Sequence, residues 1–179
     1  MRFNTRYLIL CALFASLTAI GAFMRIPLGF TSVTLQFLFA AMAGLLLGPR
    51  YGALSQVVYL FLGLAGFPVF TQGGGPGYVL TPTFGFLLGL IPAAWLTGFF
   101  AGSHPSSRRV AISALVGLAS LYLVGVPYLY FIMNFYLGHP MSVWDTIKSG
   151  MLVFLPGEAV KIAVLAFTAP PISRAMNRT

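Results

Sequence analysis

The stretch TPTFGFLLGLIPAAWLTGFFA at residues 81–101 contains no charged side chain. Its length suits a helix that crosses a bilayer, because the hydrocarbon core takes about 20 helical residues. The chain as a whole has the same character, with 59% hydrophobic and only 7% charged residues and a mean hydropathy of +0.93. This composition cannot cover a water-soluble surface, so we predict an integral membrane protein that uses lipid as its solvent.

Proline, glycine and charged residues divide the chain into several apolar runs. We predict an all-α fold, a bundle of six transmembrane helices that forms one domain over residues 1–179. The predicted spans are 6–24, 33–47, 51–66, 81–101, 110–136 and 150–171. The second and third spans are short for a bilayer, whereas the fifth is long enough to tilt or kink.

The basic residues predict the orientation of this bundle. There are ten Lys and Arg and two acidic residues, a formal charge of +8. With six spans, Arg25 and Lys148 fall on one side, Lys161 falls inside the last span, and the others fall on the side of the termini. Those others are Arg2, Arg6, Arg50, Arg108, Arg109, Arg174 and Arg178. Basic residues concentrate on the cytoplasmic side, so both termini should be cytoplasmic and the charge needs no nucleic acid to explain it. Five or seven spans would weaken this bias.

The two acidic residues are informative because they are so few. Asp145 falls in a predicted outside loop, whereas Glu158 lies about 12 Å into the last span at about 1.5 Å per residue. Lys161 follows three positions later on the same helix face. A charge at that depth costs at least about 2.5 to 3.5 kcal/mol and is functional by default. With Pro156 and Gly157 loosening the helix, we expect a polar pocket; the alternative is an ion pair that only locks the bundle.

Other side chains are candidates for the same pocket. Gln36 and Asn134 lie near the outer ends of their predicted spans, where they either line a pocket or join neighbouring helices by hydrogen bonds. The glycine-rich run 73–77 lacks the G-x-x-x-x-G-K-[ST] pattern of a phosphate-binding loop. We expect it to form a flexible outer lid, with Tyr78 as an aromatic surface or, alternatively, as an anchor at the membrane interface.

Missing motifs argue against enzyme chemistry. The sequence has no H-E-x-x-H, no G-x-S-x-G and no paired intramembrane aspartates, which disfavours a protease or an esterase. His104 and His139 occur singly in loops that we place on opposite sides of the membrane, and Cys11 is the only cysteine. We therefore expect no enzyme activity, no cofactor and no metal site.

The first span has a face of small residues. Ala15 and Ala19 are four positions apart, with Ala12, Ser16 and Ala22 beside them. Such a face lets another helix approach closely. The neighbour is either a helix of a partner protein or a helix of the same bundle.

Three stretches together resemble the BioY family, the biotin-capturing S components of energy-coupling-factor (ECF) transporters. They are TLQ at 34–36 with AGLLLGPRYGALSQ at 43–56, GLAGFPVF at 63–70 leading to Gly77-Tyr78 and Pro82-Thr83, and LPGE at 155–158 with Lys161. The resemblance covers nearly the whole chain, and the joint order of the motifs is specific. In the family pattern the acid is usually Asp, whereas this chain has Glu158.

This resemblance implies a six-helix S component in the cytoplasmic membrane of a prokaryote. It implies that the chain binds biotin from outside and docks onto a transmembrane T component driven by two cytoplasmic ATPases. The candidate substrate-binding residues are Glu158, Lys161, Tyr78, Thr83, Gln36 and Asn134, and the candidate partner-binding residues are Ala15 and Ala19. A carboxylate and an ammonium complement the ureido ring of biotin, which has two N–H donors and one carbonyl acceptor. The rival hypotheses are a proton-coupled secondary transporter and a membrane assembly subunit without a ligand.

Overall fold

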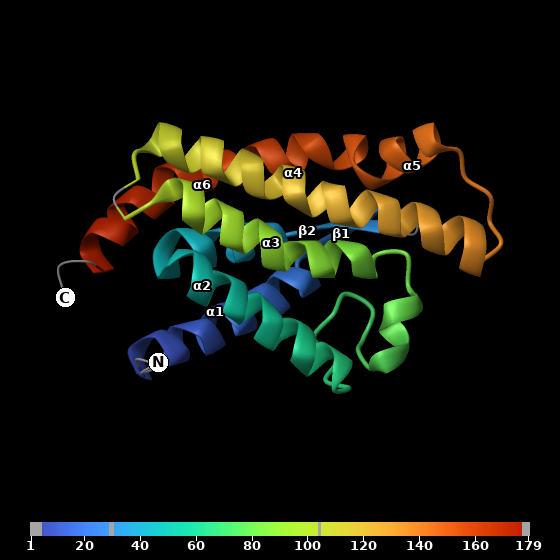
Figure 1. The fold of residues 1–179 in the computed structure, drawn as a ribbon, viewed down its shortest axis with the longest axis horizontal. Coiled ribbons are helices and arrows are strands. Elements are labelled where there is room, and N and C mark those ends of the chain that lie inside the picture. Colours follow the sequence, from blue (N-terminus) through green and yellow to red (C-terminus); the bar gives the residue numbers. More distant parts are fainter. Residues whose placement is uncertain (1–4, 29–30, 104, 177–179) are drawn as a thin grey trace.

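The computed structural model describes residues 5–28, 31–103 and 105–176 as a bundle of helices with one small sheet (Figure 1). The helices are α1 Thr5–Phe23, α2 Gln36–Leu64, α3 Phe84–Ala101, α4 Ser107–Phe131, α5 Val143–Gly150 and α6 Leu155–Met176. The strands are β1 Arg25–Leu28 and β2 Thr31–Thr34, and short helical turns cover Pro76–Leu80, Ile132–Tyr136 and Leu152–Phe154. Arg2, His104 and Arg178, on which some of the predictions partly depend, lie outside the described ranges.

The long helices are those of a multi-pass membrane protein of the all-α class. Among the described residues, five helical stretches are long and apolar enough to cross a bilayer: Thr5–Phe23, Gln36–Leu64, Phe84–Ala101, Ser107–Tyr136 and Val143–Met176. Their outer surfaces stay apolar, since Phe167 is 80% exposed and Leu123 is 77% exposed. Exposed aromatic and aliphatic side chains on this scale suit contact with lipid rather than water.

Helix α2 contains both the second and the third predicted span as two arms that meet at a sharp bend. The bend lies at Gly48, whose φ of +79° is in the left-handed region that glycine adopts without steric cost. Pro49 follows and has no N–H to continue the helical hydrogen bonds. The arms cross closely, because a Cβ on Gly52 would lie 2.6 Å from Cα of Gly44.

Small residues also bring α2 against α3. A Cβ on Gly44 would overlap the carbonyl oxygen of Ala94, and one on Gly98 would overlap the carbonyl oxygen of Gly44. Backbones that approach this closely gain van der Waals contact along the helices, which is the main attraction between helices in lipid. This contact fixes α2 and α3 as the centre of the bundle.

The hairpin of β1 and β2 was not predicted, since we expected a short outer loop at this position. The strands pair antiparallel, with Arg25 opposite Thr34 and Ile26 opposite Val33. Four-residue strands carry too little periodic signal to stand out beside long apolar helices. The hairpin matters for function because it delivers Thr34 and Gln36 to the centre of the bundle at the start of α2.

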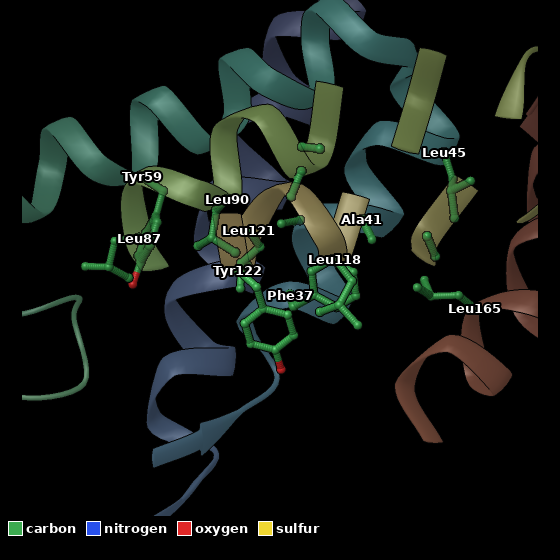
Figure 2. Close-up of a cluster of buried hydrophobic side chains, with 14 of the residues drawn as sticks. Phe37, Ala41, Leu45, Tyr59, Leu87, Leu90, Leu118, Leu121, Tyr122 and Leu165 are labelled. Atoms are coloured by element: carbon green, nitrogen blue, oxygen red, sulfur yellow. The ribbon is translucent and has the colours of Figure 1, made fainter. Parts of the chain in front are cut away.

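The apolar core lies where α2, α3, α4 and α6 meet. Figure 2 shows Phe37, Leu90 and Leu121 packed within it, while Tyr122 directs its hydroxyl away from the aliphatic side chains. In Figure 1 the two termini lie at one end of the molecule, and α5 and the connection between α2 and α3 lie at the other. The hairpin and the Tyr122 hydroxyl therefore leave polar groups beside an apolar core.

Candidate ligand-binding site

A cavity opens between the hairpin, the loop 65–83 and helices α2, α3, α4 and α6. It holds about 740 Å³ of empty space, counting the open mouth. Its apolar wall consists of Phe37, Phe86, Leu87, Leu90, Leu121 and Phe154. Its polar lining consists of Ser32, Thr34, Gln36, Thr71, Gln72, Tyr78, Thr83, Tyr122, Glu158 and Lys161. A cavity with an apolar wall and convergent polar groups is the usual form of a site for a small organic ligand.

Glu158 and Lys161 form a buried ion pair on the first turns of α6. The Lys161 Nζ donates to Glu158 Oε1 over 2.5 Å, and the two residues are only 5% and 7% exposed. The same ammonium donates to the carbonyl oxygen of Thr34 over 2.9 Å and lies 6.0 Å from the centre of the Phe37 ring. The other carboxylate oxygen, Glu158 Oε2, is buried and has no hydrogen-bond partner among the described residues. The pair is thus only half satisfied by the protein.

A second unsatisfied oxygen lies in the same cavity. The hydroxyl of Tyr122 on α4 is buried and also has no hydrogen-bond partner in the described part of the chain. A buried polar atom without a partner costs about 1 to 3 kcal/mol, so such atoms call for an explanation. Tyr122 was not among the predicted site residues, because a tyrosine inside an apolar span gives no signal that separates it from a packing residue.

Gln36 supports the wall of the cavity through a chain of hydrogen bonds. Its Oε1 accepts from Thr34 Oγ1 over 2.8 Å, and its Nε2 donates to the Tyr59 hydroxyl over 2.9 Å. Tyr59 in turn donates to the carbonyl oxygen of Val69 over 3.1 Å. One side chain therefore connects the hairpin, the second arm of α2 and the loop 65–83.

The loop 65–83, which contains the run that we expected to form a flexible lid, makes several contacts with the bundle. Phe70 is fully buried, with its ring centre 5.5 Å from that of Tyr59 and 4.6 Å from that of Tyr78. The amide of Gly75 donates to the carbonyl oxygen of Gly63 over 2.7 Å. Tyr78 is 6% exposed, and its hydroxyl lies 2.9 Å from Thr71 Oγ1. Tyr78 therefore faces the cavity rather than the membrane interface.

Of the two remaining candidates, one lines the cavity and the other does not. Thr83, immediately before α3, lines the cavity together with Glu158, Lys161, Tyr78 and Gln36. Asn134 does not line it: its Nδ2 donates to the Tyr130 carbonyl over 2.9 Å and its Oδ1 accepts from the Met141 amide over 3.0 Å. The structure thus brings together five of the six candidates, and Asn134 instead holds the connection between α4 and α5.

The small residues of α1 are divided between the bundle and the outer surface, which corrects the expected contact of Ala15 with a partner. Ala15 is only 3% exposed, and Ala19 packs against the same core cluster. A side chain that the chain itself covers cannot meet a helix of another protein. Ala15 therefore packs inside the bundle, Ala19 is half-buried, and Ala12 and Ser16 of the same set of small residues are exposed.

Comparisons with known proteins agree with one another. The sequence model of the BioY family matches residues 1–178. A probable biotin transporter BioY from Lysinibacillus sphaericus is 47% identical over 157 residues, which are 86% of this chain and 76% of that protein. The biotin transporter BioY of Thermotoga maritima is 34% identical over 165 residues, 92% and 94% of the two chains. A crystal structure of the S-component for biotin from an ECF-type ABC transporter matches with a TM-score of 0.69 and 28% identity, covering 100% of this chain and 96% of that one.

Proposed function

This chain belongs to the BioY family, and on that premise we propose that it captures biotin as the S component of an ECF transporter for uptake across the cytoplasmic membrane of a prokaryote. The observation in the molecule that carries the proposal is the half-satisfied ion pair in the cavity. Glu158 Oε2 and the Tyr122 hydroxyl are buried without partners beside an apolar wall. The chain is a transport protein, not an enzyme, and hydrolysis of ATP belongs to partner subunits.

The ureido ring of biotin matches these groups by donor and acceptor. Its N–H groups donate to Glu158 Oε2, the acceptor that the protein leaves open. Its carbonyl oxygen accepts from the remaining N–H of Lys161, whose other two are used by Glu158 Oε1 and the Thr34 carbonyl, and from the Tyr122 hydroxyl. Hydrogen bonds to charged groups are stronger than neutral ones, so this end of biotin should supply most of the specificity.

The rest of biotin suits the rest of the cavity. The thiophane ring and aliphatic tail pack against Phe37 and the leucines of α3 and α4, where apolar contact replaces water. Tyr78 and Thr83 close the side of the loop 65–83. Gln36 acts by holding the hairpin and Tyr59 in place, since its amide is already bonded to both.

The topology we propose has six crossings, with the two arms of α2 counted separately and both termini in the cytoplasm. The start of α1, the start of α4 and the end of α6, which contain Arg6, Arg108, Arg109 and Arg174, lie at the end of the molecule with the termini (Figure 1). In the proposed topology Arg50 is on the same side and Arg25 and Lys148 are on the other, as the positive-inside rule expects. The hairpin and the loop 65–83 then face outside, so biotin enters from there. The proposed partners are a transmembrane T component and two ATPase subunits, and the opposite, exposed face of α1 is open to them.

Binding of labelled biotin to the purified chain, in competition with other vitamins, tests the ligand. We expect saturable binding that unlabelled biotin alone displaces. An assembly subunit without a ligand would bind none of them. Uptake into proteoliposomes with and without the partner subunits then separates the mechanisms: an S component needs the ATPases for accumulation, whereas a proton-coupled transporter accumulates biotin with the chain alone.

A further inference from the structure

A second hollow lies at the end of the molecule that carries the termini, far from the biotin cavity. It is formed by the connection before α4 together with the last turns of α6, and it holds about 690 Å³ of empty space, counting its open mouth. Its lining consists of Pro105, Ser106, Ser107, Pro170, Ser173 and Arg174. Apart from the two prolines, the described residues of this lining carry hydroxyls or a cation.

Ser173 gives this hollow a hydroxyl. The residue is only 6% exposed, and its side chain lines the hollow. Arg174 beside it uses Nε to donate to the carbonyl oxygen of Pro170 over 3.3 Å, which holds the side chain against α6. Its terminal guanidinium nitrogens keep their donors for another acceptor.

The start of α4 adds further donors. The first N–H groups of a helix have no partners within it and carry a partial positive charge, so they favour anions. Ser106 accepts from the Arg109 amide over 3.3 Å, which leaves its own hydroxyl proton free to donate outward. The amides of Ser107 and Arg108 complete the first turn of this 25-residue helix.

No acidic side chain of the sequence neutralises this end. The two that exist are Glu158, in the biotin cavity, and Asp145, on α5 at the opposite end. A group of hydroxyl, amide and guanidinium donors without a carboxylate among the described residues fits a tetrahedral oxyanion, and phosphate above all, since guanidinium and helix N-termini both bind it well.

We propose that this hollow binds the headgroup phosphate of an anionic phospholipid. The helices that flank it, α4 and α6, expose Ile112, Leu115 and Phe167 at 51%, 54% and 80%, so apolar surface for the acyl chains continues from the phosphate donors. Anionic lipids attract basic residues at the cytoplasmic surface, the side on which the proposed topology puts this end. The site would hold α4 and α6, which both line the biotin cavity, at a fixed distance from each other.

The test measures lipid retained by the full chain in discs of mixed phosphatidylglycerol and phosphatidylcholine. After transfer to detergent, native mass spectrometry should find phosphatidylglycerol enriched on the parent protein. The double variant Ser173→Ala with Arg174→Gln should lose about tenfold of that enrichment, the effect of one charge-assisted hydrogen bond. Arg50→Gln is the matched control, because it removes one charge from the same end but does not line the hollow. Helical circular dichroism and gel filtration report whether each variant is folded.

Equal enrichment on the parent and on Ser173→Ala, the milder variant, would overturn the site. So would an equal loss in Arg50→Gln, which would indicate a general surface attraction. Inorganic phosphate added to discs of pure phosphatidylcholine separates the two sources of phosphate. If it stabilises the parent but not the double variant, and phosphatidylglycerol shows no enrichment, the hollow binds free phosphate and the lipid assignment is wrong.

Discussion

Lys161 on α6 donates a hydrogen bond to the carbonyl oxygen of Thr34, 127 positions earlier, over 2.9 Å. The same ammonium holds Glu158, so one cation links the hairpin that precedes α2 to the polar end of the cavity. Any ligand that accepts a hydrogen bond from Lys161 therefore changes the group that anchors the outer hairpin. We therefore expect ligand binding to affect how firmly the hairpin is held, through this one side chain.

Replacement of Glu158 by Gln should weaken biotin binding by more than about tenfold, or about 1.4 kcal/mol. The variant keeps the shape of the side chain but loses the charged acceptor that we assign to the ureido N–H groups. Isothermal titration measures the affinity, and thermal unfolding of each variant is recorded separately. Lys161→Met should weaken binding as well, since it removes both the ligand donor and the anchor of Thr34.

The double replacement Glu158→Gln with Lys161→Met distinguishes a ligand site from a structural ion pair. For a structural pair, each single variant leaves a buried partner behind and loses folded protein, and the double variant recovers it. Recovery of stability together with parental biotin affinity would remove both residues from the site. We expect instead that the double variant stays deficient in binding however well it folds.

Tyr122→Phe should lower biotin affinity by about 1 kcal/mol without a loss of stability. The change deletes only a hydroxyl that has no partner in the described part of the protein. Tyr59→Phe is the matched control, because its hydroxyl is bonded to Gln36 and to the Val69 carbonyl, so its loss should lower stability first. Unchanged affinity in Tyr122→Phe would leave that hydroxyl without a role.

The sequence predicted those features that depend on composition and on rare residues. Apolar runs located the long helices, and the scarcity of acids singled out Glu158 and its neighbour on the helix. The bend at Gly48 coincides with the boundary between two predicted spans, because glycine followed by proline interrupts a helix. The sequence does not show whether two separate helices or two arms of one bent helix result. The hairpin was missed because short strands give little periodic signal.

The positions of several site residues depended on the direction in which their side chains point, which the sequence does not show. Asn134 and Gln36 are both amides near outer helix ends, yet only Gln36 reaches the cavity, since a π-helical turn directs Asn134 to the Tyr130 and Met141 backbone. Ala15 turns inward because α2 packs on that side of α1. Tyr122 is a candidate because its buried hydroxyl has no hydrogen-bond partner among the described residues, and only the structure shows this.

The inward position of Ala15 predicts a stability effect. Ala15→Leu should destabilise the isolated chain by about 1 to 3 kcal/mol, because extra methyl groups have no room in a packed core. Ala12→Leu, on the exposed face of the same helix, should change stability little. Thermal unfolding in detergent compares the two. If Ala15→Leu leaves stability intact and lowers only assembly with a T component, the inward packing is wrong.

The buried position of Phe70 leads to a prediction about how fast biotin leaves the site. Its ring fills the space between Tyr59 and Tyr78 and lies against Gly63, where a Cβ would overlap it. Phe70→Ala should therefore release the loop 65–83 and speed the dissociation of biotin. If the loop and the helices unfold in one transition, the change should also lower the free energy of unfolding by about 3 to 5 kcal/mol. Hydrogen exchange of the loop amides and a chase of labelled biotin measure the two effects.

Phe67→Ala is the control for that change, since Phe67 belongs to the same loop but is 58% exposed. Its variant should exchange and dissociate like the parent. If Phe70→Ala unfolds globally before the loop loosens, exchange will rise in α2 and α3 as well as in the loop. If exchange rises only in the loop and dissociation stays slow, the loop is not the exit, and biotin leaves past the hairpin that Lys161 anchors.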